Sequence, residues 1–160
     1  MIRVHSANQR DLGPMVDIDM RSYEYPLSYV DIKQHLQSRS SICIIAADDN
    51  NSVIGYAIFK VHSEQRLLEI VRLAVEPKHR CQGAGKDLLR VGIDLGSNKG
   101  VDKVFVVVPE LLCVPNKPGD VSRWLSYAGF RAVQVLKNAF VMYGSECDGY
   151  KFTKDISYDS

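Results

Sequence analysis

A glycine-rich turn constrains this chain more than any other stretch, because a run typical of a strand precedes it and a run typical of a helix follows it. The first run, Leu67–Val75, is mostly apolar, with Glu69 and Arg72 set into it. A Glu76-Pro77 break comes next, and then the turn Arg80–Lys86, with glycine at positions 83 and 85. We therefore expect a helix to begin inside this turn.

The residues after the turn predict that helix and a second strand. Leucine, isoleucine and glycine recur at helical spacing from Gly85 to Gly96, and Lys99-Gly100 supplies a basic last turn and a glycine stop. Val104–Val108 is a continuous β-branched and aromatic run, typical of a strand covered on both faces. A strand, a helix and a strand in this order predict a parallel crossover.

Such a crossover places the helix N-terminus at the carboxyl end of the first strand, where unpaired amides and the helix dipole favour an anion. The two glycines let an anion approach the backbone, and Arg80 and Lys86 add positive charge. A dinucleotide fingerprint would need a glycine at Leu88, and a P-loop would need Ser or Thr at Asp87. Both alternatives fail, and we expect a phosphorylated cofactor held by another motif.

The pattern Arg-x-x-Gly-x-Gly after a strand resembles the cofactor motif of the GNAT superfamily of acetyl-CoA-dependent N-acetyltransferases. Leu67–Val108 as a whole resembles the central core of that family. In the family, the strand pairs with the pantetheine arm of acetyl-CoA and the amides of the turn hold the pyrophosphate. The alternative is a glycine turn that only joins strand to helix. The resemblance implies that the following residues bind acetyl-CoA: Leu73, Ala74, Val75, Arg80, Cys81, Gln82, Gly83, Ala84, Gly85, Lys86 and Asn116.

Length and charge narrow the class of protein further. A chain of 160 residues suits one domain, and we expect a single N-acetyltransferase domain over residues 1–160. The 20 Lys and Arg nearly balance the 19 Asp and Glu without forming runs, so we expect neither a nucleic-acid nor a membrane partner. There is no CxxC pair, signal sequence or long apolar span. We expect a cytoplasmic monomer or homodimer with no metal.

The N-terminal third predicts a strand, two helices and the loop between them. Ile2–His5 alternates apolar and polar residues, and a helix with a regular start at Pro14 should end near Tyr23, before Ser28 caps a second helix. In GNAT proteins this helix-loop-helix borders the groove for the acceptor amine. The resemblance therefore implies that Tyr23, Glu24 and Tyr25 contact the acceptor, against the alternative of tyrosines that only pack.

The remaining elements complete a mixed sheet. Residues 42–47 and 53–61 predict an antiparallel hairpin, and the turn His62–Arg66 leads into the strand at Leu67. Residues 109–119 are irregular, Asp120 caps a short helix that ends at Gly129-Phe130, and residues 132–136 and 150–153 form a last strand pair around an unassigned segment. The expected fold is α/β (α+β) and GNAT-like: antiparallel N-terminal strands, a parallel β-α-β crossover and helices on both faces.

Glu69 is our candidate general base, because an ammonium with an ordinary pKa of about 10.4 must lose a proton before it can accept an acetyl group. It is the one acid inside the central strand, where loss of water would favour its protonated form. The sequence Leu67–Val71 also resembles the strand of the histone-lysine acetyltransferase branch, in which a glutamate at this spacing is the base. The alternative is a structural ion pair between Glu69 and Arg72 or another cation. His62 and Glu64 are weaker candidates for proton transfer.

The general acid is less well defined. The family often uses a tyrosine four residues before the Gly-Phe pair that ends this helix, here Gly129-Phe130, and that position is Leu125. Tyr127 is the nearest substitute, and Tyr143 and Tyr150 are further possibilities. The resemblance also implies that backbone amides after Leu73 polarise the thioester carbonyl. The predicted activity is direct transfer of acetyl to the primary amine of a peptide or small molecule. The competing hypothesis is a non-catalytic acyl-CoA-binding module.

Overall fold

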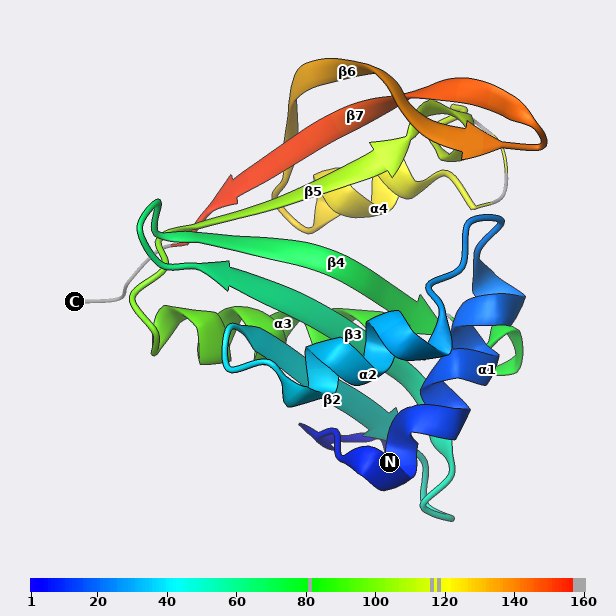
Figure 1. Ribbon diagram of the computed structural model, residues 1–160, viewed down its shortest axis with the longest axis vertical. Helices are drawn as coiled ribbons and strands as arrows, with labels where there is room; N and C mark the ends of the chain where they lie inside the picture. The colour runs from blue at the N-terminus through cyan, green and yellow to red at the C-terminus, as the bar shows by residue number, and fades with distance from the viewer. Residues whose placement is uncertain (81, 116, 118, 157–160) are drawn as a thin grey trace.

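The described part of the computed structural model, residues 1–80, 82–115, 117 and 119–156, contains one seven-stranded sheet in the order β1-β2-β3-β4-β5-β7-β6 (Figure 1). Only β4 and β5 pair in parallel; every other neighbouring pair is antiparallel. The predicted mixed sheet is therefore confirmed. The strands are β1 (Arg3–Ser6), β2 (Ser41–Ala47), β3 (Val53–His62), β4 (Leu67–Val75), β5 (Lys103–Pro109), β6 (Arg131–Met142) and β7 (Ser145–Asp155).

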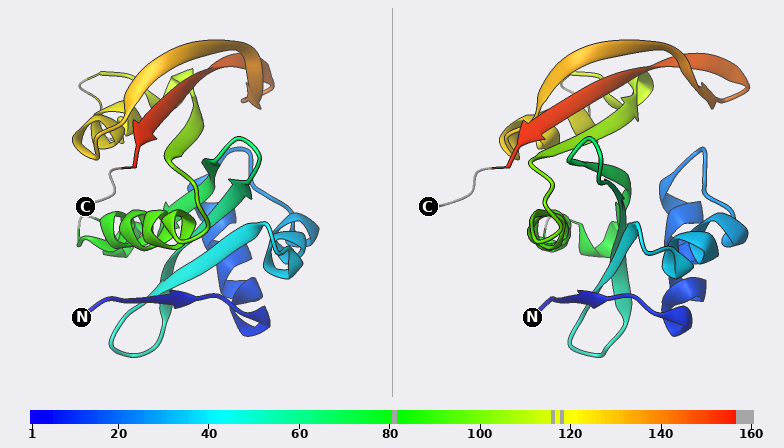
Figure 2. Two further views of the ribbon diagram at one scale, coloured as in Figure 1. Left: turned by 90° about the vertical axis from the view of Figure 1, so that its left-hand side faces the viewer. Right: turned by 60° about the vertical axis from the view of Figure 1, so that its left-hand side comes forward.

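Helices lie on both faces of this sheet, as expected (Figure 2). Apolar residues of α1 and α2 pack with β2, β3 and β4 on one face, whereas α3 and α4 contribute to a larger cluster on the other face. The helices are α1 (Leu12–Ser22), α2 (Tyr29–Gln37), α3 (Ala84–Ser97) and α4 (Val121–Tyr127), and three short 3-10 helices are η1 (Gln9–Asp11), η2 (Pro77–His79) and η3 (Glu110–Leu112). The face covered by α1 and α2 carries several side chains of the candidate site.

Local capping explains where the N-terminal helices start. Asn8 caps η1, which runs directly into α1, so the helix begins at Leu12 and not at Pro14 as predicted. Pro14 fits in the first turn because an amide hydrogen there would have no intrahelical partner. Ser28 caps α2 as predicted, since its hydroxyl accepts from the amide of Asp31 while the Asp31 carboxylate accepts from the amide of Ser28.

The glycines of α3 let the helix lie close to the sheet. A β-carbon at Gly92 would come within 2.1 Å of the Phe59 ring, and one at Gly96 would come within 2.9 Å of Leu68. Phe59 and Leu68 are both fully buried. The face of α3 that carries these glycines therefore packs against side chains of β3 and β4.

Two predictions for the C-terminal half need correction. Residues 104–108 do not form a strand buried on both faces: Val104, Val106 and Val108 are buried, but Phe105 and Val107 are half-buried, because α1 and α2 do not extend across β5. The unassigned segment 137–149 is mostly strand, since β6 and β7 form one long hairpin. Its tight turn places Tyr143 and Gly144 at positive φ, as hairpin turns of this kind require.

Candidate active site

The candidate site is a wedge in the sheet between β4 and β5, which we call the splay. The two strands pair only at Leu67–Lys103, Leu68–Val104 and Glu69–Phe105, and beyond Glu69 they diverge (Figure 1). The edge of β4 from Ile70 to Val75 therefore has no strand partner on the β5 side. An extended ligand with amide groups could hydrogen-bond to this edge as an added strand does.

Backbone groups of Leu73 and Val75 point into the splay. The amide of Glu76 donates to the carbonyl of Ile54 on β3, and in an antiparallel ladder alternate residues turn their polar groups to opposite sides. Accordingly, the carbonyl of Leu73 accepts from the Tyr23 hydroxyl at 2.7 Å, and that of Val75 accepts from Arg80 Nε at 2.9 Å. The strand thus offers a row of donors and acceptors next to the glycine turn.

The N-terminus of α3 closes the far end of this row. Gly83 is its N-cap with φ +91°, and no atom lies within 4 Å of a β-carbon built there. Gln82, Gly83 and Lys86 are exposed, while Ala84 is buried in the core. Open amides at a helix start, with Lys86 and Arg80 nearby, fit a phosphate group. The predicted cofactor residues Cys81 and Asn116 lie outside the described residues.

A β-bulge in β4 decides which of its side chains face α1 and α2. Arg72 pairs with Ile58 and Ile70 pairs with Phe59, so Val71 has no partner in the ladder. Strict alternation would place Glu69 and Arg72 on opposite faces of the sheet. The extra residue instead turns both toward α1 and α2.

Glu69 lies where β4 and β5 begin to separate. Its Oε1 is 2.9 Å from His62 Nε2, and its side chain is 34% exposed, so it keeps more water than the sequence suggests. His62 is the last residue of β3, not a turn residue, and its ring lies against that of Phe105. The Lys151 ammonium lies 4.8 Å from the centroid of the Phe105 ring. Glu69 thus pairs with His62 and not with Arg72, whose partner is Asp19.

Arg72 instead belongs to a buried polar cluster that sequence reasoning missed. Asp19 is fully buried, and its Oδ1 lies 3.2 Å from Arg72 Nε, an ion pair without an aligned hydrogen bond. The Tyr56 hydroxyl and the Leu27 amide both donate to Asp19, and Arg72 also donates to the carbonyl of Tyr25. The sequence carried one sign that Asp19 is buried: it follows Met15 by four residues and so lies on the apolar side of α1.

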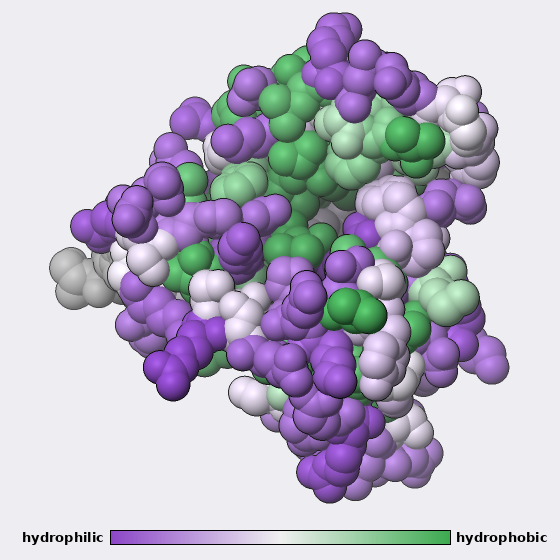
Figure 3. Space-filling view, in the orientation of Figure 1, coloured by the Kyte–Doolittle hydropathy of each residue, from purple (hydrophilic) through white to green (hydrophobic). Residues whose placement is uncertain are grey.

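The cluster holds the loop between α1 and α2 against β4. The Arg72 guanidinium carbon lies 4.3 Å from the centroid of the Tyr23 ring and 4.7 Å from that of Tyr25. The two rings contact each other edge to face, and Tyr25 also meets Phe140 of β6 at 5.2 Å. Loop and hairpin therefore meet over the splay, where Figure 3 shows hydrophobic residues gathered between them. Glu24 is exposed on the same loop.

The described part of α4 presents no tyrosine hydroxyl to the splay. Leu125, at the position where the family often has its acid, is buried in the core, and Tyr127 is 80% exposed beside Arg123. Trp124 instead approaches the site, 3.7 Å from a β-carbon built at Gly85. Tyr143 lies exposed at the hairpin tip. We therefore do not retain Tyr127 as the general acid.

The described residues give little support to a cysteine nucleophile or a metal site. Burial raises the pKa of the Cys113 thiol to about 11, so little reactive thiolate forms at neutral pH. The described His, Cys, Asp and Glu side chains form no group of three that would hold a metal ion. No helix in the described ranges has both the length and the apolar character needed to cross a membrane.

Comparison with known proteins agrees with this geometry. Arabidopsis thaliana NAA60 bound to acetyl-CoA superposes with a TM-score of 0.84 at 19% identity, covering 98% of this chain and 99% of that one. The ribosomal-protein-S18-alanine N-acetyltransferase of Escherichia coli gives 0.81 at 19% identity, covering 100% and 97%. A chimera of spermidine N-acetyltransferase SpeG from Vibrio cholerae and hSSAT gives 0.78 at 14% identity, covering 96% and 95%. No curated protein sequence matches.

Structural likeness at these identities shows a shared fold. Family membership comes from the sequence, because residues 12–111 match the pattern of the Acetyltransferase (GNAT) family. The matched range includes the splay strand β4, the glycine turn, α3 and the loop with Tyr23 and Tyr25. The chain therefore belongs to the GNAT acetyltransferase family.

Proposed function

We propose that this protein transfers an acetyl group from acetyl-CoA directly to a primary amine, without an acetylated enzyme. The observation that carries the proposal is the splay: the polar groups of Leu73 and Val75 face an open wedge that leads to the N-terminus of α3. Leu73 and Val75 would pair with the amides of the pantetheine arm. The amides after Gly83, with Arg80 and Lys86, would hold the pyrophosphate.

The chain's own residues supply a route for the proton of the acceptor. Acetyl-CoA, when bound, supplies a carbonyl carbon activated by a thiolate leaving group. Glu69 lies on the α1–α2 face of β4, the face that also carries the loop with Tyr23 and Tyr25. We propose that Glu69 accepts the ammonium proton and that His62, 2.9 Å away, orients the carboxylate.

The acceptor belongs between that loop and the β6–β7 hairpin. Aromatic rings of Tyr23, Tyr25 and Phe140 line this side of the splay, and the exposed Glu24 adds a negative charge for a cationic amine. The similar structures include an N-acetyltransferase for the alanine of a ribosomal protein and one for spermidine. We accordingly propose a peptide or a small-molecule amine as the acceptor.

A panel of amines tests the proposed function. We expect release of coenzyme A thiol from acetyl-CoA with at least one of three probes: spermidine, lysine amide, or peptide amides that begin with alanine, serine or methionine. Product mass should rise by one acetyl group on the amine. Binding of acetyl-CoA with no thiol release on any probe would instead support a non-catalytic acyl-CoA-binding module.

The glycine turn gives a matched test of the cofactor site. Gly83→Ala and Gly100→Ala both place a side chain at left-handed φ, +91° and +87°, with nothing within 4 Å of the new carbon. The cost to folding should therefore be similar, about 1 kcal/mol each. Only Gly83→Ala should weaken acetyl-CoA, by about tenfold, because only Gly83 lies where a phosphate meets the backbone.

Thermal shift with and without acetyl-CoA measures this difference, because a ligand of the folded state raises Tm by mass action. Gly100 lies beyond the opposite end of α3, so the Gly100→Ala protein should keep the full shift. Equal shifts in the two variants would place the phosphate elsewhere.

A further inference from the structure

The Tyr23 hydroxyl lies beside the backbone of Leu73, on the part of β4 that faces the splay. It is 2.7 Å from the carbonyl oxygen of Leu73 and 3.5 Å from the amide nitrogen of the same residue. Both Leu73 groups point away from β3 and into the wedge. In this structure the Tyr23 O–H donates to the Leu73 carbonyl, and the Leu73 N–H points at the Tyr23 oxygen. When a pantetheine amide takes that carbonyl, as proposed above, the Tyr23 O–H is released and lies beside the Leu73 N–H as a second donor.

Neighbouring groups hold the phenol in place. The Arg72 guanidinium lies over the ring, 4.3 Å from its centroid, and is itself fixed by the buried Asp19 and the carbonyl of Tyr25. The Tyr25 ring also packs edge to face with the Tyr23 ring, with 5.3 Å between their centroids. Because the ring is fixed, only the O–H has to rotate to reach a developing charge, and little reorganisation is needed.

The hydroxyl also keeps its proton. Burial raises the pKa of Tyr23 above its ordinary value, and the favourable effects of Arg72 and the Leu73 backbone do not cancel that increase. A phenol of this kind is neutral at physiological pH and donates a hydrogen bond. It is thus suited to stabilising an oxygen and poorly suited to releasing a proton.

We infer that Tyr23 is a second hydrogen-bond donor, beside the Leu73 amide, to the carbonyl oxygen of the acetyl group that is transferred. This inference rests on the proposed function. Glu69 takes one proton from the ammonium, the free amine nitrogen forms the new C–N bond while the C–S bond breaks with its electron pair on sulfur, and the second nitrogen proton passes through solvent to the thiolate. Tyr23 keeps its own proton throughout.

Tyr23→Phe tests the role, because it keeps the ring on Arg72 and removes only the O–H. Calorimetry with two probes, acetyl-CoA and coenzyme A, separates the effects. Affinity for acetyl-CoA should fall about 2- to 10-fold, as for one lost hydrogen bond, while affinity for coenzyme A, which has no acetyl carbonyl, stays unchanged. With an amine that the panel identifies, kcat should fall about 10²-fold with little change in the KM for that amine.

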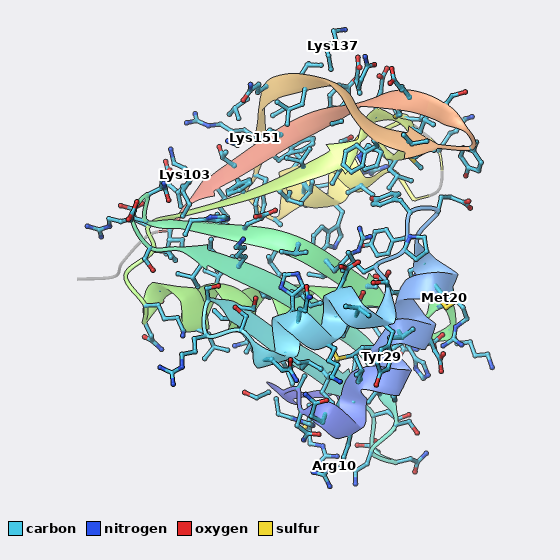
Figure 4. All side chains as sticks on the ribbon, viewed as in Figure 1. Arg10, Met20, Tyr29, Lys103, Lys137 and Lys151 are labelled. Carbon is cyan, nitrogen blue, oxygen red and sulfur yellow. The ribbon has the colours of Figure 1, made fainter. Side chains whose placement is uncertain are left out.

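Tyr29→Phe is the matched control, since Tyr29 is an exposed tyrosine on α2 away from the splay (Figure 4). It should leave both affinities and kcat as in the wild type. A lower Tm in Tyr23→Phe with an unchanged ratio of acetyl-CoA to coenzyme A affinity would overturn the inference, because the hydroxyl would then only tie the loop to β4. Lost discrimination with no turnover on any amine would support Tyr23 while rejecting the proposed acetyl transfer.

Discussion

The Glu69→Gln variant should transfer acetyl about 10²–10⁴ times more slowly than the wild type at neutral pH. Glutamine keeps the shape of the side chain and a hydrogen bond to His62, but it has no basicity to take the ammonium proton. Affinity for acetyl-CoA should change little, because the predicted cofactor contacts begin at Leu73, beyond the bulge. The measurement is kcat by thiol release, with acetyl-CoA affinity by calorimetry as a second readout.

The pH profile separates a lost base from a damaged fold. Activity of the Glu69→Gln protein should recover as pH approaches the ordinary pKa of a lysine-type amine, about 10.4, because free amine then forms without help. Glu64→Gln is the control, because Glu64 is an exposed residue of the turn between β3 and β4, and this variant should keep the kcat of the wild type. Near wild-type kcat at neutral pH in a folded Glu69→Gln enzyme would remove Glu69 from the mechanism and leave water or His62 as the base.

The Arg72→Met variant should lose about 3–5 kcal/mol of folding free energy, the cost of leaving one member of a buried ion pair without its partner. Asp19 is fully buried and Arg72 is 8% exposed, so water cannot replace the guanidinium. Methionine fills similar space but carries no charge. At about 2–4 °C per kcal/mol for a domain of this size, Tm should fall by roughly 10 °C.

Two further variants show whether the unpaired charge of Asp19 causes this loss of stability. Arg21→Met removes a pair with Glu76 in which the arginine is 53% exposed, and it should cost less than about 1 kcal/mol. Asp19→Asn combined with Arg72→Met removes both buried charges and should recover part of the loss. An Arg72→Met protein as stable as the Arg21→Met protein would show that the buried cluster contributes nothing to stability.

Several features of this protein were determined by short stretches of its sequence. The glycine turn, the start of α3 near Gly83, the cap at Ser28 and the hairpin of β2 and β3 all follow from residues within a few positions of one another. Turn and cap preferences act over that range, and helical spacing shows directly which face is apolar. The crossover and the glycine turn that begins α3 could therefore be predicted before any contact was known.

The part of the candidate site around Glu69 and Tyr23 depended on tertiary structure. A bulge at Val71 turns Arg72 to the same face as Glu69, and β3 brings His62 to Glu69. Arg72, which the sequence suggested as a partner of Glu69, instead pairs with Asp19 of α1. The phenol of Tyr23 reached Leu73 across 50 residues of chain. No local preference encodes such pairs, because each depends on strand register and helix packing, which are decided when distant segments bury their apolar faces together.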